Sequence, residues 1–236
     1  MKISGVIWDY DGTLVDSRMK NLRVTKAIIS EITSDLDIDL SALSSLENYE
    51  KANIKSSNWR DLYRNEFGLD EKQIDDAGRL WTKFQLSDKT DVDLFEGISL
   101  IVPKLNEYPQ GIVSQNSSDN IKRNLGRFDL AKYFNHVIGY EEVDLTKQKP
   151  NPEGLLICIS EIADLRENDS VIYIGDHFTD MQCAHHANDR MNRNAVISIL
   201  LNHNKSNLTD GWDHKPDYVA DHPKDILEII DKVVNA

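Results

Sequence analysis

The sequence predicts an α/β fold, with a Rossmann-like, doubly wound and mainly parallel sheet as its core and an inserted α-helical domain. The first observation is that short apolar runs alternate with helix-like stretches through the second half of the chain. Parallel strands need long crossover connections, so this alternation indicates a parallel sheet covered by helices on both faces. The second observation is that residues 17–94 carry apolar positions at helical spacing and only weak strand signals.

The strands of the core are predicted from apolar runs that end in polar residues or glycine. The first is 3–8, and the later ones are 111–113, 136–139, 171–174, 195–200 and, more weakly, 218–220. Helices are expected between them, over 120–128, 152–164, 180–188 and 224–234. A further helix over 97–107 contains Pro103, which should kink it or delay its start.

The predicted inserted domain interrupts this core after its first strand. Apolar residues at helical spacing occur around Leu22 and Ile28, around Trp59 and Leu62, and around Leu80. The stretch 90–94 is expected to lead back to the sheet. A chain of 236 residues is long enough for a core domain and a smaller one. We therefore expect the core over 1–16 and 95–236 and the helical domain over 17–94.

Composition limits the classes of function. The net charge is −13, which disfavours binding to nucleic acid, because that binding depends on clustered Lys and Arg. No apolar run reaches the length of a membrane span and no signal-like segment opens the chain, so we expect a cytoplasmic protein without membrane partners. The only cysteines, Cys158 and Cys183, show no paired spacing and are not expected to form a disulfide.

Polar residues follow several predicted strands where each strand ends. Asp9 and Asp11 follow the first strand, and a segment at 114–116 follows the second. Two further segments, 147–152 and 175–180, precede helices. Ligands of doubly wound sheets bind at the carboxyl ends of the strands, so these segments should form one site. Two carboxylates at the end of a buried strand need a counter-charge, which a divalent cation would supply.

The residues Asp9-Tyr10-Asp11-Gly12-Thr13-Leu14-Val15-Asp16-Ser17 resemble the first motif of the haloacid dehalogenase superfamily. The other three segments match its remaining motifs in order and rough spacing, and the helical insertion sits where this family places its cap. The resemblance, which is to a phosphoglycolate-phosphatase-like branch with a helical cap, implies a phosphoric monoester hydrolase. Its expected partner is a small phosphorylated metabolite, and the chain is expected to be a monomer or dimer.

The resemblance also implies the role of each site residue. Asp9 would be the nucleophile that forms an aspartyl-phosphate, and Asp11 the general acid and base. Mg2+ would be bound by Asp9, the backbone carbonyl of Asp11, and Asp176. Asp180 would orient metal-bound waters or Lys149. The residues expected to bind the substrate phosphate are Ser114, Gln115, Asn116 and Lys149, of which Ser114 and Lys149 would also be catalytic.

The function that follows is a magnesium-dependent phosphatase acting on a small phosphomonoester, such as a phosphoglycolate-like compound or a sugar phosphate. A phosphomutase of the same family, or a non-catalytic binding module on the same fold, remains an alternative. Asp11 argues against a dehalogenase, since such relatives lack this second aspartate.

Two other metal sites are weighed from the residues alone. A calcium loop starting at Asp9 would need Glu at its twelfth position, where the chain has Lys20. A zinc site at Cys183, His185 and His186 has no evident fourth ligand, and on a helix only positions 183 and 186 share a face. The role of these three residues is left open.

Overall fold

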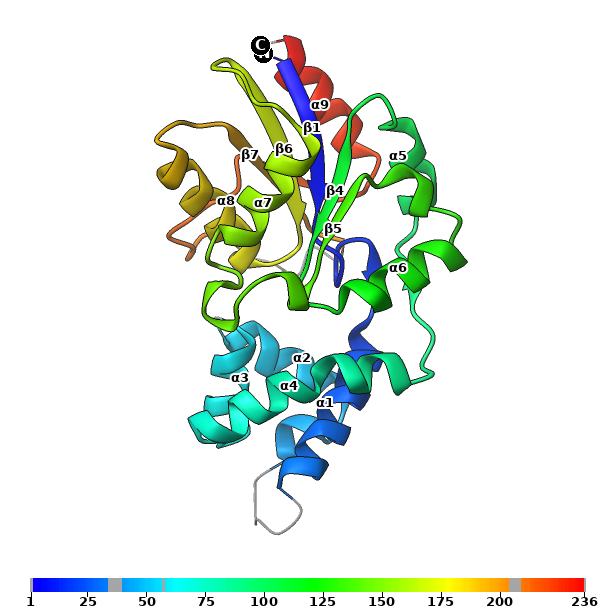
Figure 1. Ribbon diagram of the computed structural model, residues 1–236, viewed down its shortest axis with the longest axis vertical. Coiled ribbons are helices and arrows are strands. Elements are labelled where there is room, and N and C mark those ends of the chain that lie inside the picture. The colour runs from blue at the N-terminus through cyan, green and yellow to red at the C-terminus, as the bar shows by residue number, and fades with distance from the viewer. Residues whose placement is uncertain (1, 34–39, 57, 204–208, 236) are drawn as a thin grey trace. The chain divides into compact units, whose positions relative to one another are not determined.

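The computed structural model describes residues 2–33, 40–56, 58–203 and 209–235 (Figure 1). It divides into two compact units. An α/β unit consists of residues Met1–Asp16 and Asp93–Ala236, and a helical unit consists of Ser17–Val92.

The α/β unit is built on a six-stranded parallel sheet with the strand order β5-β4-β1-β6-β7-β8. Its strands are β1 (Lys2–Trp8), β4 (Gln110–Val113), β5 (His136–Ile138), β6 (Asp169–Gly175), β7 (Val196–Leu201) and β8 (Tyr218–Ala220). From the central β1 the chain adds strands first on one side and then on the other. This reversal places a switch point at the carboxyl end of β1, where doubly wound folds bind ligands. The predicted fold class is confirmed.

Helices connect these strands and cover the sheet. They are α5 (Ile98–Lys104), α6 (Ser118–Arg127), α7 (Glu153–Ile162), α8 (Phe178–Met191) and α9 (Asp225–Asn235). Short 3-10 turns lie at Ala131–Tyr133, Tyr140–Glu142 and Leu145–Lys147. Helix α7 packs on β4 and β5, α8 packs on β6 and β7, and the two helices contact each other. Their shared core contains Leu155, Cys158, Cys183 and Ala187, all of them buried.

Helix α5 is shorter than its sequence pattern indicated. It ends at Lys104, one residue after Pro103, and does not continue to Glu107. Proline has no backbone N–H and its ring crowds the preceding turn, so it is poorly tolerated inside a longer helix. The chain continues instead in turns, where the N–H of Asn106 bonds to the carbonyl of Pro103.

The helical unit contains α1 (Arg18–Ile32), a 3-10 turn (Ser41–Leu43), α2 (Leu46–Lys55), α3 (Trp59–Asn65) and α4 (Glu71–Ser87). Side chains such as Ile28, Tyr63 and Ile74 form its buried core. Ser45 and Asn58 cap α2 and α3, and a capping box of Asp70 and Gln73 starts α4. The aromatic side chains Trp59, Trp81 and Phe84 pack on this core and are partly buried.

A short antiparallel ribbon within the α/β unit joins β2 (Val15–Asp16) to β3 (Asp93–Leu94). The N–H of Phe95 also bonds to the carbonyl of Leu14. The stretch 90–94 was expected only as a linker, and a two-residue strand carries too little pattern to be read from sequence. No helix of the described residues is long and apolar enough to cross a membrane.

Candidate active site

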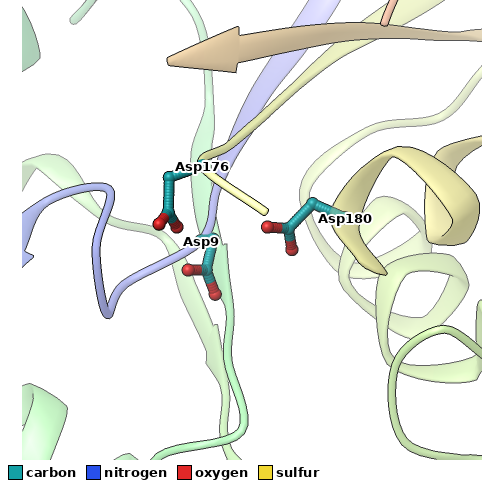
Figure 2. A group of neighbouring side chains, drawn as sticks. All are labelled: Asp9, Asp176 and Asp180. Atoms are coloured by element: carbon teal, nitrogen blue, oxygen red, sulfur yellow. The ribbon is translucent and has the colours of Figure 1, made fainter. Parts of the chain in front are cut away.

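Asp9 occupies the carboxyl end of β1, and Asp176 lies at the same edge of the sheet after β6. Asp180 comes from the first turn of α8. Figure 2 shows the three carboxylates turned toward one another. One ligand oxygen from each lies within 4.8 Å of the others, and the described residues hold no other group of three His, Cys, Asp or Glu with such geometry. This arrangement suits a hard divalent cation, which prefers oxygen ligands.

Burial and neighbouring negative charges make the carboxylates of Asp9 and Asp176 costly to ionise. Burial, opposed by Lys149 but reinforced by Asp180 and Asp11, raises the pKa of Asp9 to about 7. Burial and the charges of Asp9 and Asp180 raise the pKa of Asp176 well above its ordinary value. The ionised forms of Asp9 and Asp176 would therefore be stabilised by positive charge in addition to that of Lys149. A cation at this place would offset that cost, so the residues fit a metal ion.

Lys149 supplies one buried positive charge. Its Nζ lies 2.6 Å from Oδ1 of Asp9 and 2.8 Å from Oδ1 of Asp180. Burial opposes its charge, yet the carboxylates of Asp180 and Asp9 raise the pKa of Lys149 above its ordinary value. The ammonium group also lies 5.4 Å from the ring centroid of Tyr173. Lys149 thus stays charged and bridges two acidic side chains.

Asp180 holds this lysine in place. Its Oδ1 accepts a hydrogen bond from the Tyr173 hydroxyl at 2.9 Å, and its Oδ2 accepts one from the His177 N–H at 3.1 Å. A Cβ added at Gly175 would overlap the Asp180 side chain, so glycine is required where β6 ends. Of the two roles expected for Asp180, the structure shows contact with Lys149.

Side chains from other parts of the α/β unit contact the backbone carbonyls of the loop that carries Lys149. Gln115 donates to the carbonyl of Lys149 at 3.4 Å, and His186 Nδ1 lies 2.9 Å from that of Pro150. A carbonyl only accepts, so Nδ1 of His186 carries the hydrogen. The thiol of Cys183 points to the carbonyl of Asn151 at 3.7 Å. The peptide between Lys149 and Pro150 is cis.

The three α8 side chains weighed as zinc ligands each contact a backbone carbonyl. Cys183 and His186 contact the Lys149 loop, and Nε2 of His185 lies 3.1 Å from the carbonyl of Lys215. Burial raises the pKa of the Cys183 thiol to about 12. Both Cys183 and Cys158 are free thiols.

Asp11 is contacted by Asn116, which lies beyond the end of β4. The Asn116 amide group is 2.9 Å from Oδ2 and 3.1 Å from Oδ1 of Asp11. The backbone N–H of Asn116 donates to Oγ of Ser114 at 3.1 Å. Ser114 therefore accepts this bond and can use its own O–H toward another acceptor.

The loop after β1 fits closely around Asp176. Gly12 has φ 81°, and an added Cβ there would overlap the Asp176 carboxylate. The hydroxyl of Thr13 donates to Oδ1 of Asp176 at 3.1 Å. A residue with a side chain at position 12 would be strained and would push the carboxylate away.

The structure thus places every predicted site residue at one edge of the sheet. Direct contacts join Asp9, Lys149 and Asp180, and a second set joins Asp11, Asn116 and Ser114. The side chain of Gln115 contacts the backbone of Lys149. The assignment of Gln115 and Asn116 to substrate binding stays a prediction. Sequence reasoning gave no part in the site to Thr13 and Tyr173, nor to Asn120, whose Nδ2 donates to Oδ1 of Asn116 at 3.1 Å. It considered His186 only as a zinc ligand.

The missed residues gave little signal. Tyr173 lies in an apolar strand, where only the need to satisfy its buried hydroxyl marks it as unusual. Asn120 and His186 lie on helices, one and two turns from the motif segments, and only tertiary structure shows what they contact.

Comparison with known proteins identifies the family. The model of the family described as "Haloacid dehalogenase-like hydrolase" matches residues 6–192. The chain is 24% identical over 239 residues to pyrophosphatase PpaX of Listeria welshimeri, with 97% of each chain covered. It is 25% identical over 200 residues to phosphoglycolate phosphatase of Salmonella choleraesuis, with 77% of each covered.

Solved structures agree on the fold. A proposed phosphoglycolate phosphatase from Lactobacillus plantarum superposes with a TM-score of 0.70 at 20% identity, covering 97% of this chain and all of the other. A haloacid dehalogenase-like hydrolase from Bacteroides fragilis gives 0.72 at 19% identity, covering 92% and 96%. The predicted family and enzyme class are confirmed: this chain belongs to the haloacid dehalogenase-like hydrolases.

Proposed function

We propose that the chain is a magnesium-dependent phosphatase that hydrolyses a small phosphomonoester through an aspartyl-phosphate on Asp9. The observation that carries this proposal is the contact of Asp9 with Lys149, 2.6 Å apart, inside a group of three converging carboxylates. The Asp9 carboxylate lies beside one buried positive charge, and the neighbouring carboxylates suit a second one, that of a metal ion. Two positive charges would offset the repulsion between this carboxylate and an anionic phosphate, so Asp9 is suited to attack phosphorus.

The proposed nucleophile must approach a group of its own charge. Lys149 neutralises part of the Asp9 charge, and its ammonium group would also attract phosphoryl oxygens as the bond to phosphorus forms. Ser114, whose Oγ already accepts the Asn116 N–H, would donate its O–H to another phosphoryl oxygen. Bound by Asp9, the Asp11 carbonyl and Asp176, Mg2+ would supply the remaining positive charge.

Two proton transfers complete the reaction, and both are assigned to Asp11. In the first half, an Asp9 oxygen bonds to phosphorus while the bond to the leaving oxygen breaks, and Asp11 gives that oxygen a proton. In the second half, the oxygen of a water molecule bonds to phosphorus while Asp11 takes a proton from it. The bond from Asp9 to phosphorus then breaks and inorganic phosphate leaves.

The substrate class is proposed at the level of a small phosphorylated acid or sugar. The relatives named phosphoglycolate phosphatase support this, whereas those named pyrophosphatase PpaX support pyrophosphate as a second candidate. A phosphomutase would use the same residues but return the phosphoryl group to the sugar. A non-catalytic module has no need of a Lys149 buried between two carboxylates.

A screen of the purified protein with Mg2+ separates these candidates. Phosphoglycolate, sugar phosphates, nucleotides and pyrophosphate are assayed for released phosphate, with Asp9→Asn and excess chelator as controls. We expect release from at least one compound, lost in both controls. An isomerised sugar phosphate without free phosphate would favour the mutase. No turnover of any compound would contradict the proposed function.

A further inference from the structure

Behind Asp11 lies a pair of buried asparagines at the start of α6. Asn116 precedes the helix and Asn120 lies in its first turn, four residues on, and both are buried. Nδ2 of Asn120 donates to Oδ1 of Asn116 at 3.1 Å. Nδ2 of Asn116 in turn donates to both carboxylate oxygens of Asp11. Amide groups thus connect the helix to the predicted acid and base.

The direction of each amide is fixed by a group that can only donate. The backbone N–H of Ser117 bonds to Oδ1 of Asn116 at 2.8 Å, so the oxygen of this amide must face Ser117. The guanidinium group of Arg123 bonds to Oδ1 of Asn120 at 2.9 Å, which fixes the second amide. The NH2 group of Asn120 therefore faces the Asn116 oxygen, and the NH2 group of Asn116 faces Asp11. An exchange of N and O in either amide would set two acceptors against each other.

This contact suits a group that changes protonation during a reaction. The Asn116 NH2 group is a donor only, and a carboxyl group keeps an acceptor oxygen whether or not it is protonated. The same hydrogen bond can therefore persist through both half-reactions. It restrains where the carboxyl group lies without competing for its proton.

We propose that Asn120 is a positioning residue for the reaction: through Asn116 it holds the Asp11 carboxyl group where it must exchange a proton with the leaving oxygen and the attacking water. The inference rests on the proposed function, since it concerns the acid and base of that mechanism. A misplacement of about 1 Å can cost on the order of a hundredfold in rate, so a residue outside the reacting shell can matter.

The test compares Asn120→Ala with wild type on two substrates. One is para-nitrophenyl phosphate, whose leaving group needs no proton. The other is the alkyl phosphomonoester that wild type hydrolyses fastest among phosphoglycolate, glycerol phosphate and hexose phosphates. We expect kcat/KM to fall about ten- to a hundredfold on the alkyl phosphate and less than about threefold on the nitrophenyl compound.

Further variants separate positioning from general damage. Asn120→Asp puts an acceptor against Oδ1 of Asn116 and should lose at least as much on the alkyl substrate as Asn120→Ala. Asn116→Ala should show the same dependence on the leaving group. Asn124→Ala is the matched control, because this asparagine lies one turn further on and reaches Asn120 only at 3.5 Å. It should leave the ratio of the two rates unchanged.

The possible outcomes are distinct. Three outcomes would overturn the role of Asn120 and leave the proposed phosphatase activity in place. They are equal losses on both substrates, no loss on either substrate, and a dependence on the leaving group in Asn116→Ala but not in Asn120→Ala. Wild type without activity on either substrate would overturn the proposed function, and the positioning role with it. Thermal unfolding of each variant shows that the compared proteins are folded.

Discussion

Among the described residues, the ion pairs with both side chains buried lie in the α/β unit, whereas those of the helical unit are at least partly exposed. In the α/β unit, Lys149 and Asp180 have side chains that are only 5% and 3% exposed, and they contact each other directly. In the helical unit, Arg64 pairs with Asp61 and Glu71, whose side chains are 29% and 62% exposed. Exposed ion pairs contribute little to stability, whereas breaking a buried pair leaves an uncompensated charge. The buried charges are therefore the ones whose presence needs a functional explanation.

The largest effect is expected from Lys149→Met. Removing the ammonium group leaves the carboxylates of Asp9 and Asp180 buried together without a positive charge beside them, at a cost of about 3–5 kcal/mol in stability. Activity should fall by roughly a hundred- to a thousandfold, because an electrostatic contact to the reacting group is lost. Urea unfolding and phosphate release measure the two effects. A variant with wild-type stability would show that the network contributes no net stability.

The next effect concerns metal binding and pH. A raised carboxylate pKa means that the folded protein holds its proton more tightly than the unfolded chain does. The stability that this tighter proton binding contributes is present at low pH and is lost as pH rises toward about 7, the pKa of Asp9. In the proposed site Mg2+ would bind the ionised carboxylates, so it would compete with protons.

Mg2+ should therefore raise the thermal midpoint more at pH 8 than at pH 6. Thermal unfolding with Mg2+ or chelator, at both pH values, measures the difference. Asp176→Asn is the matched variant and should remove most of it. An equal rise at both pH values, or one unaffected by Asp176→Asn, would place the metal elsewhere.

A smaller effect is expected from His186, which contacts the Lys149 loop and not Lys149 itself. His186→Leu removes one hydrogen bond to a backbone carbonyl, worth about 0.5–1.5 kcal/mol, so kcat should fall roughly two- to tenfold. His186→Asn places an amide N–H near the position of Nδ1 and should restore much of the loss. His185→Gln is the control, since His185 contacts the carbonyl of Lys215 instead. A loss as large in the control would show that the helix, and not the loop contact, is responsible.

The smallest effect is expected in the helical unit. Arg64→Gln removes the ion pairs of Arg64 with Asp61 and Glu71, at a surface where solvent screens the charges. The thermal midpoint should move by less than about 2 °C. A shift as large as that of Lys149→Met would mean that exposure does not separate the two kinds of ion pair.

The sequence predicted the α/β unit well because its signals are local. Each strand of the six-stranded sheet contains an apolar run, and Asp9, Asp11, Asp176 and Asp180 stand in short motifs directly after strands. The alternation of strands with helices implied crossover connections between parallel strands. Parallel strands bring the motifs that follow them to one edge of the sheet.

The contacts between those motifs could not be predicted, because they depend on side chains far apart in the chain. Lys149 contacts Asp9 across 140 positions, and Asn116 contacts Asp11 across 105. The two-residue strands β2 and β3 are too short to produce a period. In the helical unit, spacing predicted helices and core positions, but helical spacing carries no information about which substrate is bound.

The central claim, that Asp9 becomes phosphorylated, has a direct test. Asp11→Asn keeps the nucleophile but slows the attack of water, so the intermediate should accumulate when para-nitrophenyl phosphate and Mg2+ are added. Acid quenching followed by borohydride reduction converts an aspartyl-phosphate to homoserine, which mass spectrometry of the peptide locates. We predict homoserine at position 9, in a yield that falls when the quench is delayed. Substrate turnover without modification of Asp9 at any time would contradict the account.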